Sequence, residues 1–314
     1  MKLELAGKKP VSRQVVLSLD GSTRVCSVAI LTPRASQEKT AADNCHETKR
    51  SALCWEVMGR ESASEGRGQA RLLLVMIERL LSSAGLEPAD LAAVVVGVGP
   101  GTFTGVRVAV ATARAIALAL NIPVVGVSSL AALAAQAALV IKEERIEARS
   151  LVTVVDAHRR QVFFAVYERA AVQPDGDCPV CWQVKTPYAA CDLDTLGQFV
   201  GEGSLVVAEE ARLVASLPAG TMVRIFPLGA QYLVEGQHLL AEDRVSFLRA
   251  ILAEEVMGPA GAGLQPRLDK PGDPGTPESV VPIYVRPPDA EVHITKMRDP
   301  WANDSGMQRI SRGR

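Results

Sequence analysis

The chain has 314 residues, of which 48% are hydrophobic and 22% are charged, and its formal net charge is −1. This composition supports a sizeable buried core, and the length is typical of about two domains. The near-neutral charge gives no indication of a nucleic-acid or membrane surface, and the opening "MKLELAGKKP" lacks the apolar segment of a signal peptide. We therefore expect a cytoplasmic protein that does not engage a membrane.

Strands are expected in "QVVLSLD" and "VCSVAIL", which the tight segment "GSTR" joins as a hairpin. Residues 32–68 then become polar and charged, which we interpret as a solvated insertion. A helix is expected in "QARLLLVMIERLLSSAG", with Gly85 at its end. The apolar "LAAVVV" is typical of a buried strand, and it leads through the glycine-rich turn "GVGPGTFTGVR" into an alanine-rich helix.

A further buried strand, "PVVGV", precedes a second alanine-rich helix that Ser128 caps. The second half restarts with the strands "LVTVVDA" and "QVFFAVYE", followed by a second polar insertion at 169–181. A short helix in "DLDTLGQFV", strands in "SLVVA" and "TMVRIF", and a helix in "RVSFLRAILAEEV" complete the pattern. Alternating strands and helices predict an α/β fold with some parallel pairing.

The C-terminal part is expected to contain little regular structure. Residues 258–279 hold five glycines and five prolines, the signature of a linker, and the polar tail at 291–314 is expected to be disordered. Only the short extended piece "VPIYVRP" lies between them.

Two turns have residue types that suit phosphate binding. The first follows the strand that ends at Asp20, and the second is the glycine-rich turn before the alanine-rich helix, where free N–H groups of a helix start attract anions. The candidate residues are Asp20, Gly21, Ser22, Thr23, Gly99, Gly101 and Thr102. The alternatives are an ordinary hairpin for the first turn and close backbone packing for the second, which matches neither the P-loop nor G-x-G-x-x-G.

Catalytic and metal motifs are missing from the sequence. The four histidines are scattered, and "CPVC" (178–181) has zinc or redox spacing but no second cysteine pair beside it. Asp156 and His158 suggest a dyad, although residues i and i+2 of a strand share a face simply because of the strand period. We therefore predict no metal site and no cofactor.

The alanine-rich helices suggest a different role. A helix that carries mainly methyl groups lets a neighbour approach closely, either its own sheet or a helix of another chain. The candidate interface residues on this helix and on the preceding one are Leu73, Ile77, Val106, Val110, Ala113 and Ala117.

Three stretches together closely resemble the TsaB (YeaZ) family of bacterial tRNA threonylcarbamoyladenosine biosynthesis proteins. They are "VVLSLDGSTRVCSVAIL", the segment from "ERLLSSAG" through "GVGPGTFTGVRVAVATARAIALAL" to "SSLAALA", and "VVDAHRRQVFFAVYE". The resemblance implies a two-lobed, actin-like (ASKHA) fold in which each lobe is a mixed sheet flanked by helices. The first lobe would span 14–141, with the insertion at 32–68, and the second would span 150–290.

The resemblance also implies a function without catalysis. TsaB-like proteins bind and activate TsaD, the transferase that modifies adenosine 37 of tRNA, together with the P-loop ATPase TsaE, and tRNA reaches them through the complex. The contact with TsaD is made through first-lobe helices, and a homodimer is the alternative assembly without TsaD. The paralogous TsaD carries two metal-binding histidines on the helix that matches "SSLAAL", and these positions are Ser129 and Leu133 here. Leucine is no metal ligand and serine is a poor one, so the metal site is not expected.

The sequence departs from the family pattern at the first long helix, where Gln69 and Val75 replace the usual histidine and proline. A rival interpretation stays open, namely a free-standing enzyme of the same superfamily, either a nucleotide-dependent phosphotransferase or a peptidase. It would use Asp20, the glycine-rich turn and Asp156 around a nucleotide.

Overall fold

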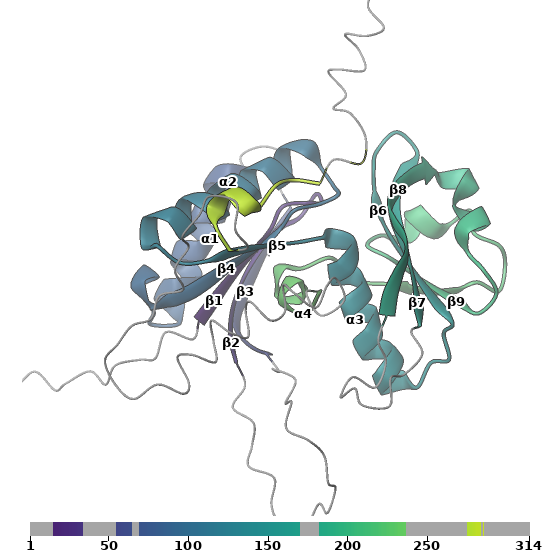
Figure 1. Cartoon of the computed structure of the whole chain (residues 1–314), viewed down its shortest axis with the longest axis horizontal. Helices are drawn as coiled ribbons and strands as arrows, with labels where there is room; N and C mark the ends of the chain where they lie inside the picture. The colour runs from purple at the N-terminus through teal and green to yellow at the C-terminus, as the bar shows by residue number, and fades with distance from the viewer. Residues whose placement is uncertain are drawn as a thin grey trace, which may run out of the picture.

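The computed structural model describes residues 15–33, 55–64, 69–169, 182–236, 275–283 and 285. These residues form two lobes, each built on a five-stranded sheet (Figure 1). The helix expected in "RVSFLRAILAEEV", the "CPVC" motif, most of the linker and the tail at 291–314 lie outside the described residues.

The first sheet has the strand order β3-β2-β1-β4-β5. Strand β1 pairs antiparallel with β2 and parallel with β4, β2 pairs antiparallel with β3, and β4 pairs parallel with β5. The strands are β1 (Val15–Asp20), β2 (Cys26–Pro33), β3 (Trp55–Ala63), β4 (Leu91–Gly97) and β5 (Val124–Val127). The prediction of a mixed sheet with parallel pairing is confirmed.

Strand β3 corrects the interpretation of residues 32–68 as a solvated insertion. Part of that segment, "WEVMGRESA", is an edge strand that alternates between half-buried and exposed residues. A strand at a sheet edge keeps much of its surface in water and carries charges that discourage further pairing. Its polar composition therefore resembles that of a loop.

Helices cover both faces of this sheet. On one face, Leu17 and Leu19 pack with α1 (Gln69–Ser83) and α2 (Phe103–Leu120). On the other face, Val16 packs with α3 (Ser129–Glu144) and with α4 (Leu233–Gly236). Helix α1 begins at Gln69, so Val75, which replaces the proline of the family pattern, lies inside the helix rather than at its start.

The second sheet, of order β10-β9-β6-β7-β8, repeats the topology of the first. Its first strand, β6, again pairs antiparallel with the next strand and parallel with a later one. The strands are β6 (Ser150–Asp156), β7 (Gln161–Arg169), β8 (Trp182–Asp192), β9 (Ser204–Ala208) and β10 (Met222–Ile225). The two lobes therefore repeat one topology, and in each the first strand ends in an aspartate, Asp20 or Asp156.

Short 3-10 helices, rather than α-helices, cover the outer face of the second sheet. They are η2 (Leu193–Phe199) and η3 (Ala211–Val214), and each buries one leucine, Leu196 or Leu213, against the strands. The short helix expected in "DLDTLGQFV" is thus the 3-10 helix η2. Strand β8, which the sequence analysis did not predict, forms the edge of this sheet.

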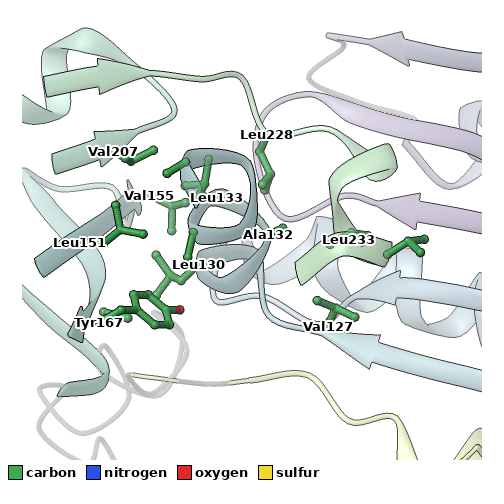
Figure 2. Close-up of a cluster of buried hydrophobic side chains, with 14 of the residues drawn as sticks. Val127, Leu130, Ala132, Leu133, Leu151, Val155, Tyr167, Val207, Leu228 and Leu233 are labelled. Atoms are coloured by element: carbon green, nitrogen blue, oxygen red, sulfur yellow. The ribbon is translucent and has the colours of Figure 1, made fainter. Parts of the chain in front are cut away.

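Helix α3 lies between the lobes and belongs to the cores of both (Figures 1 and 2). Leu130 and Leu133 point toward Leu151, Val155 and Tyr167 of the second lobe (Figure 2). The opposite side of the same helix, marked by Ala132, turns toward the first lobe (Figure 2). The residues around α3 form one continuous apolar cluster.

Candidate functional site

The two candidate phosphate turns lie against each other in the first lobe. The Ser22 carbonyl accepts a hydrogen bond of 2.7 Å from the Thr102 N–H, and the Thr102 hydroxyl donates to the Gly21 carbonyl at 3.1 Å. A Cβ at Gly101 would lie 2.0 Å from the Ser22 oxygen, and one at Gly97 would lie 2.1 Å from Asp20 Oδ1. Gly97 and Gly101 are therefore required because the two turns approach each other closely.

This contact bears on the two interpretations of the glycine-rich turn and favours close packing. An anion at a helix start needs free N–H groups and space in front of them. Here the N–H of Thr102, the N-cap residue of α2, already binds the Ser22 carbonyl, and the place next to Gly101 is filled by Ser22. The turn therefore has less space, and one free N–H group fewer, for a phosphate at this helix start. Close packing accounts for Gly101.

Asp20 is completely buried at the end of β1. Its carboxylate accepts hydrogen bonds from the Ser22 N–H at 3.3 Å and from the Ser22 hydroxyl at 3.1 Å. Burial raises the pKa of Asp20 from 3.8 to about 6, and the hydrogen bonds from Ser22 only partly oppose this. Thr23, the next residue, bonds only locally, to the backbone of Val25.

Asp156, the equivalent residue of the second lobe, has a different environment. Its carboxylate accepts hydrogen bonds from Arg212 Nη2 at 2.6 Å and from the His158 N–H at 2.8 Å, and His158 Nδ1 lies at 3.1 Å. Burial raises the pKa of Asp156, but these partners outweigh it and hold the pKa below its ordinary value. The predicted pairing of Asp156 with His158 therefore exists, within a cluster that includes Arg212.

A third carboxylate, which the sequence analysis did not identify, lies between these two. Glu209 follows β9, and its Oε1 accepts a hydrogen bond of 2.8 Å from the Asp156 N–H. Burial raises the pKa of Glu209 to about 7, and the charges of Glu210, Asp156 and Asp20 add to this effect. Within the described ranges, no group of three or more His, Cys, Asp or Glu side chains has the arrangement of a metal site.

The Asp156 turn is also conformationally unusual. His158, Arg159 and Arg160 have φ angles of 59°, 54° and 61°, so three consecutive non-glycine residues are left-handed. The His158 N–H bond to Asp156, a bond from the Gln161 N–H to the His158 carbonyl and one from the Leu193 N–H to the Arg160 carbonyl hold the turn in place. These bonds account for how the turn keeps this conformation.

The two positions that correspond to metal-binding histidines in TsaD are enclosed in the core. Ser129 and Leu133 are both fully buried on α3. The Ser129 N–H bonds to the Gly99 carbonyl, and Leu133 packs in the apolar cluster between the lobes (Figure 2). The surroundings of Leu133 are apolar, so they contain no side chain that could bind a metal ion at this position.

The six predicted interface residues lie inside the first lobe, which corrects their assignment to a partner surface. Each is less than 8% exposed and packs beneath α1 and α2 against the chain's own sheet. They are Leu73, Ile77, Val106, Val110, Ala113 and Ala117. Helical periodicity identifies the apolar side of a helix, and in this lobe the sheet occupies that side.

The exposed side of α2 is apolar in the second half of the helix, where residues other than the predicted ones form it, and it carries Thr104 and Arg107 in the first half. Ala111, Ala115, Leu118 and Ala119 are exposed, and Leu118 keeps 72% of its surface accessible. By length and composition alone, α2 is apolar enough to cross a membrane. In this structure 33% of its 18 residues are buried inside the lobe. On α1, Leu74 is 56% exposed. We call Ala111, Ala115, Leu118 and Ala119 the outer face of α2.

Comparison with known proteins agrees with this architecture. Residues 64–176 match the family model described as "TsaD: tRNA N6-adenosine threonylcarbamoyltransferase". A search of curated proteins gave no match. YeaZ from Pseudomonas aeruginosa superposes with a TM-score of 0.54 at 22% identity, covering 86% of this chain and 99% of YeaZ.

A second Pseudomonas aeruginosa structure, an uncharacterized protein with similarity to peptidase YeaZ, also gives a TM-score of 0.54 at 22% identity. It covers 87% of this chain and 100% of that protein. Both matches extend over the two lobes, and so they show that the fold is the two-lobed, actin-like one of YeaZ. In fold the chain is similar to YeaZ, and its residues 64–176 are similar to the TsaD family.

Proposed function

We propose that this protein is a non-catalytic scaffold subunit in the biosynthesis of tRNA N6-threonylcarbamoyladenosine. It binds and activates a TsaD-like transferase and acts together with a TsaE-like ATPase, and tRNA contacts the resulting complex. The match of residues 64–176 to the TsaD family and the YeaZ-like fold support this system. The cytoplasm is where such a complex would work.

The outer face of α2 is the observation that carries the proposal. Its side chains are three alanines and one leucine, so a helix of another chain can approach to the short end of the usual 8–10 Å range. Exposed apolar surface of this kind typically marks a contact with another protein. The partner therefore contacts Ala111, Ala115, Leu118 and Ala119 rather than the buried residues of the same helices.

The lobe junction supports a scaffold over a phosphotransferase. Asp20, Asp156 and Glu209 bring three acidic groups to this region, and Arg212 already pairs with Asp156 and Glu210. Carboxylates repel the phosphates of a nucleotide unless a divalent cation bridges them, and among the described residues no cluster of His, Cys, Asp or Glu side chains could hold one. The Ser22 carbonyl also engages one of the N–H groups, that of Thr102, which could otherwise face a phosphate.

The test is binding of the purified TsaD-like protein to Ala115→Glu and Leu118→Glu, measured by calorimetry. Both positions are exposed, so the variants should fold, and a charge in an apolar helix contact should weaken binding about 100-fold. Ala215→Glu, at the end of η3 in the second lobe, is the matched control at an exposed alanine. Unchanged affinity in both α2 variants would remove this surface from the proposal.

The rival function is tested in a separate assay of the same preparations. A scaffold should be required for tRNA modification by TsaD- and TsaE-like proteins and should be inactive alone. Metal-dependent ATP turnover or peptide cleavage by the pure protein, lost in Asp20→Ala, would instead establish a free-standing enzyme.

A further inference from the structure

The C-terminal part of the chain returns to the first lobe as a short strap, residues 275–283. The Gly275 carbonyl accepts a hydrogen bond of 2.9 Å from the Val124 N–H of β5, and the Ile283 N–H donates to the Val98 carbonyl at 2.7 Å. Between these bonds, Val280 is buried in the core of the lobe. The strap is therefore attached firmly to the sheet.

The strap also holds α2 from the side. Arg114, on α2, donates from Nε to the Pro277 carbonyl at 2.5 Å and from Nη2 to the Glu278 carbonyl at 3.2 Å. In Figure 1 the yellow-green 3-10 turn of the strap (Pro277–Ser279) lies along this helix. Arg114 thus connects the helix to a segment that is itself bonded to β5 and to the chain just after β4.

Helix α2 has particular need of such a connection. Its fully buried residues are glycine, alanines and valines, and Val108, Ile116 and Leu120 are partly buried beside them, so short side chains make up most of its contact with the sheet. Packed helices with smooth contacts slide more readily than helices with interlocked side chains. Thr102 bonds to the Ser22 and Gly21 carbonyls at the start of the helix, and Arg114 adds a second polar attachment in its middle.

We propose that Arg114 is a positioning residue, which fixes the rotation and translation of α2 by binding the strap and so presents the outer face of α2 to the partner. The inference rests on the proposed function for the identity of the partner, but the positioning itself does not. The buried apolar face holds α2 on the sheet, and a polar attachment in the middle of the helix adds a directional constraint on its rotation and translation.

The positioning is measured without a partner, by electron–electron distance spectroscopy between spin labels at Ala115→Cys on α2 and Arg60→Cys on β3. Both labelled positions are exposed. The cysteines of the wild-type chain that a spin label can reach are replaced beforehand. Arg114→Met should broaden the distance distribution about twofold, because the chain stays apolar and long but loses both bonds. Arg114→Lys should restore part of the narrow distribution, since an ammonium group still donates to a carbonyl.

Val280→Ala removes apolar contacts between the strap and the core without changing any residue of α2. It should also broaden the distance distribution between the two spin labels. An unchanged distribution in Arg114→Met and Val280→Ala would overturn the proposal. Binding of the TsaD-like protein is the second measurement, and Arg114→Met should lower the affinity about tenfold. If the wild-type protein does not bind, the proposed function fails, while the spin-label result still decides the role of Arg114.

Discussion

Replacement of Asp20 by asparagine should change how the stability of the protein depends on pH. In the unfolded chain this carboxyl has its ordinary pKa of 3.8, and in the folded protein its pKa is about 6. An acid whose folded pKa is raised favours folding only while it is protonated, so its contribution is present at low pH and is lost as the pH rises through 6.

The size of this effect follows from the two pKa values. Their separation corresponds to about 3 kcal/mol in total, of which about 1.4 kcal/mol falls between pH 8 and pH 5. Asparagine keeps the shape of a protonated aspartic acid and can retain both contacts with Ser22. Asp20→Asn should therefore be more stable than the wild type at pH 8, and this advantage should shrink by about 1.4 kcal/mol at pH 5.

Urea unfolding followed by circular dichroism at both pH values measures the difference between the two proteins. Titrating groups that do not interact with Asp20 cancel in this comparison, whereas Glu209 is coupled to it. Glu209→Gln is the matched control, because the pKa of Glu209 is also raised, to about 7, and it should remove its own part of the pH dependence. An equal difference between wild type and Asp20→Asn at pH 8 and pH 5 would refute the buried-carboxylate reasoning.

Three further predictions concern the packing of the first lobe. Gly101→Ala places a methyl group 2.0 Å from the Ser22 carbonyl and should lower the free energy of unfolding by about 3 kcal/mol or more, measured by urea unfolding. Ala113→Glu buries a charge in the core and should abolish folding, seen as loss of the circular dichroism spectrum, unlike glutamate at the exposed positions of α2. Ser129→His with Leu133→His should destabilise the protein without creating zinc affinity in calorimetry, because the imidazoles enter an enclosed core; zinc binding by a folded double variant would contradict this.

Much of the fold follows from local patterns in the sequence. The buried strands β1, β4, β6 and β9 are nearly uniform apolar runs, and such runs with turns between them identify central strands. The edge strands β3 and β8 were missed because one side of each faces water and charged or polar residues interrupt the pattern. The edge strands β5 and β10 were found because their sequences are short apolar runs, so it is the polar edge strands that periodicity fails to detect.

The candidate site was predictable in part. The sequence indicated that the Asp20 turn and the glycine-rich turn mattered, but not that Ser22 and Gly101 touch, because that contact joins residues far apart in the chain. Glu209 had no local signal, since it approaches Asp156 only when β9 pairs with β6. Periodicity found the apolar side of α2, yet it could not tell which chain covers that side.

Helix α3 packs against residues from both halves of the molecule, so neither half has a complete hydrophobic core by itself. A fragment that ends after α3 would leave Leu130 and Leu133 facing water, and a fragment that begins with β6 would expose Leu151 and Val155. The halves of this duplicated chain have become mutually dependent for folding.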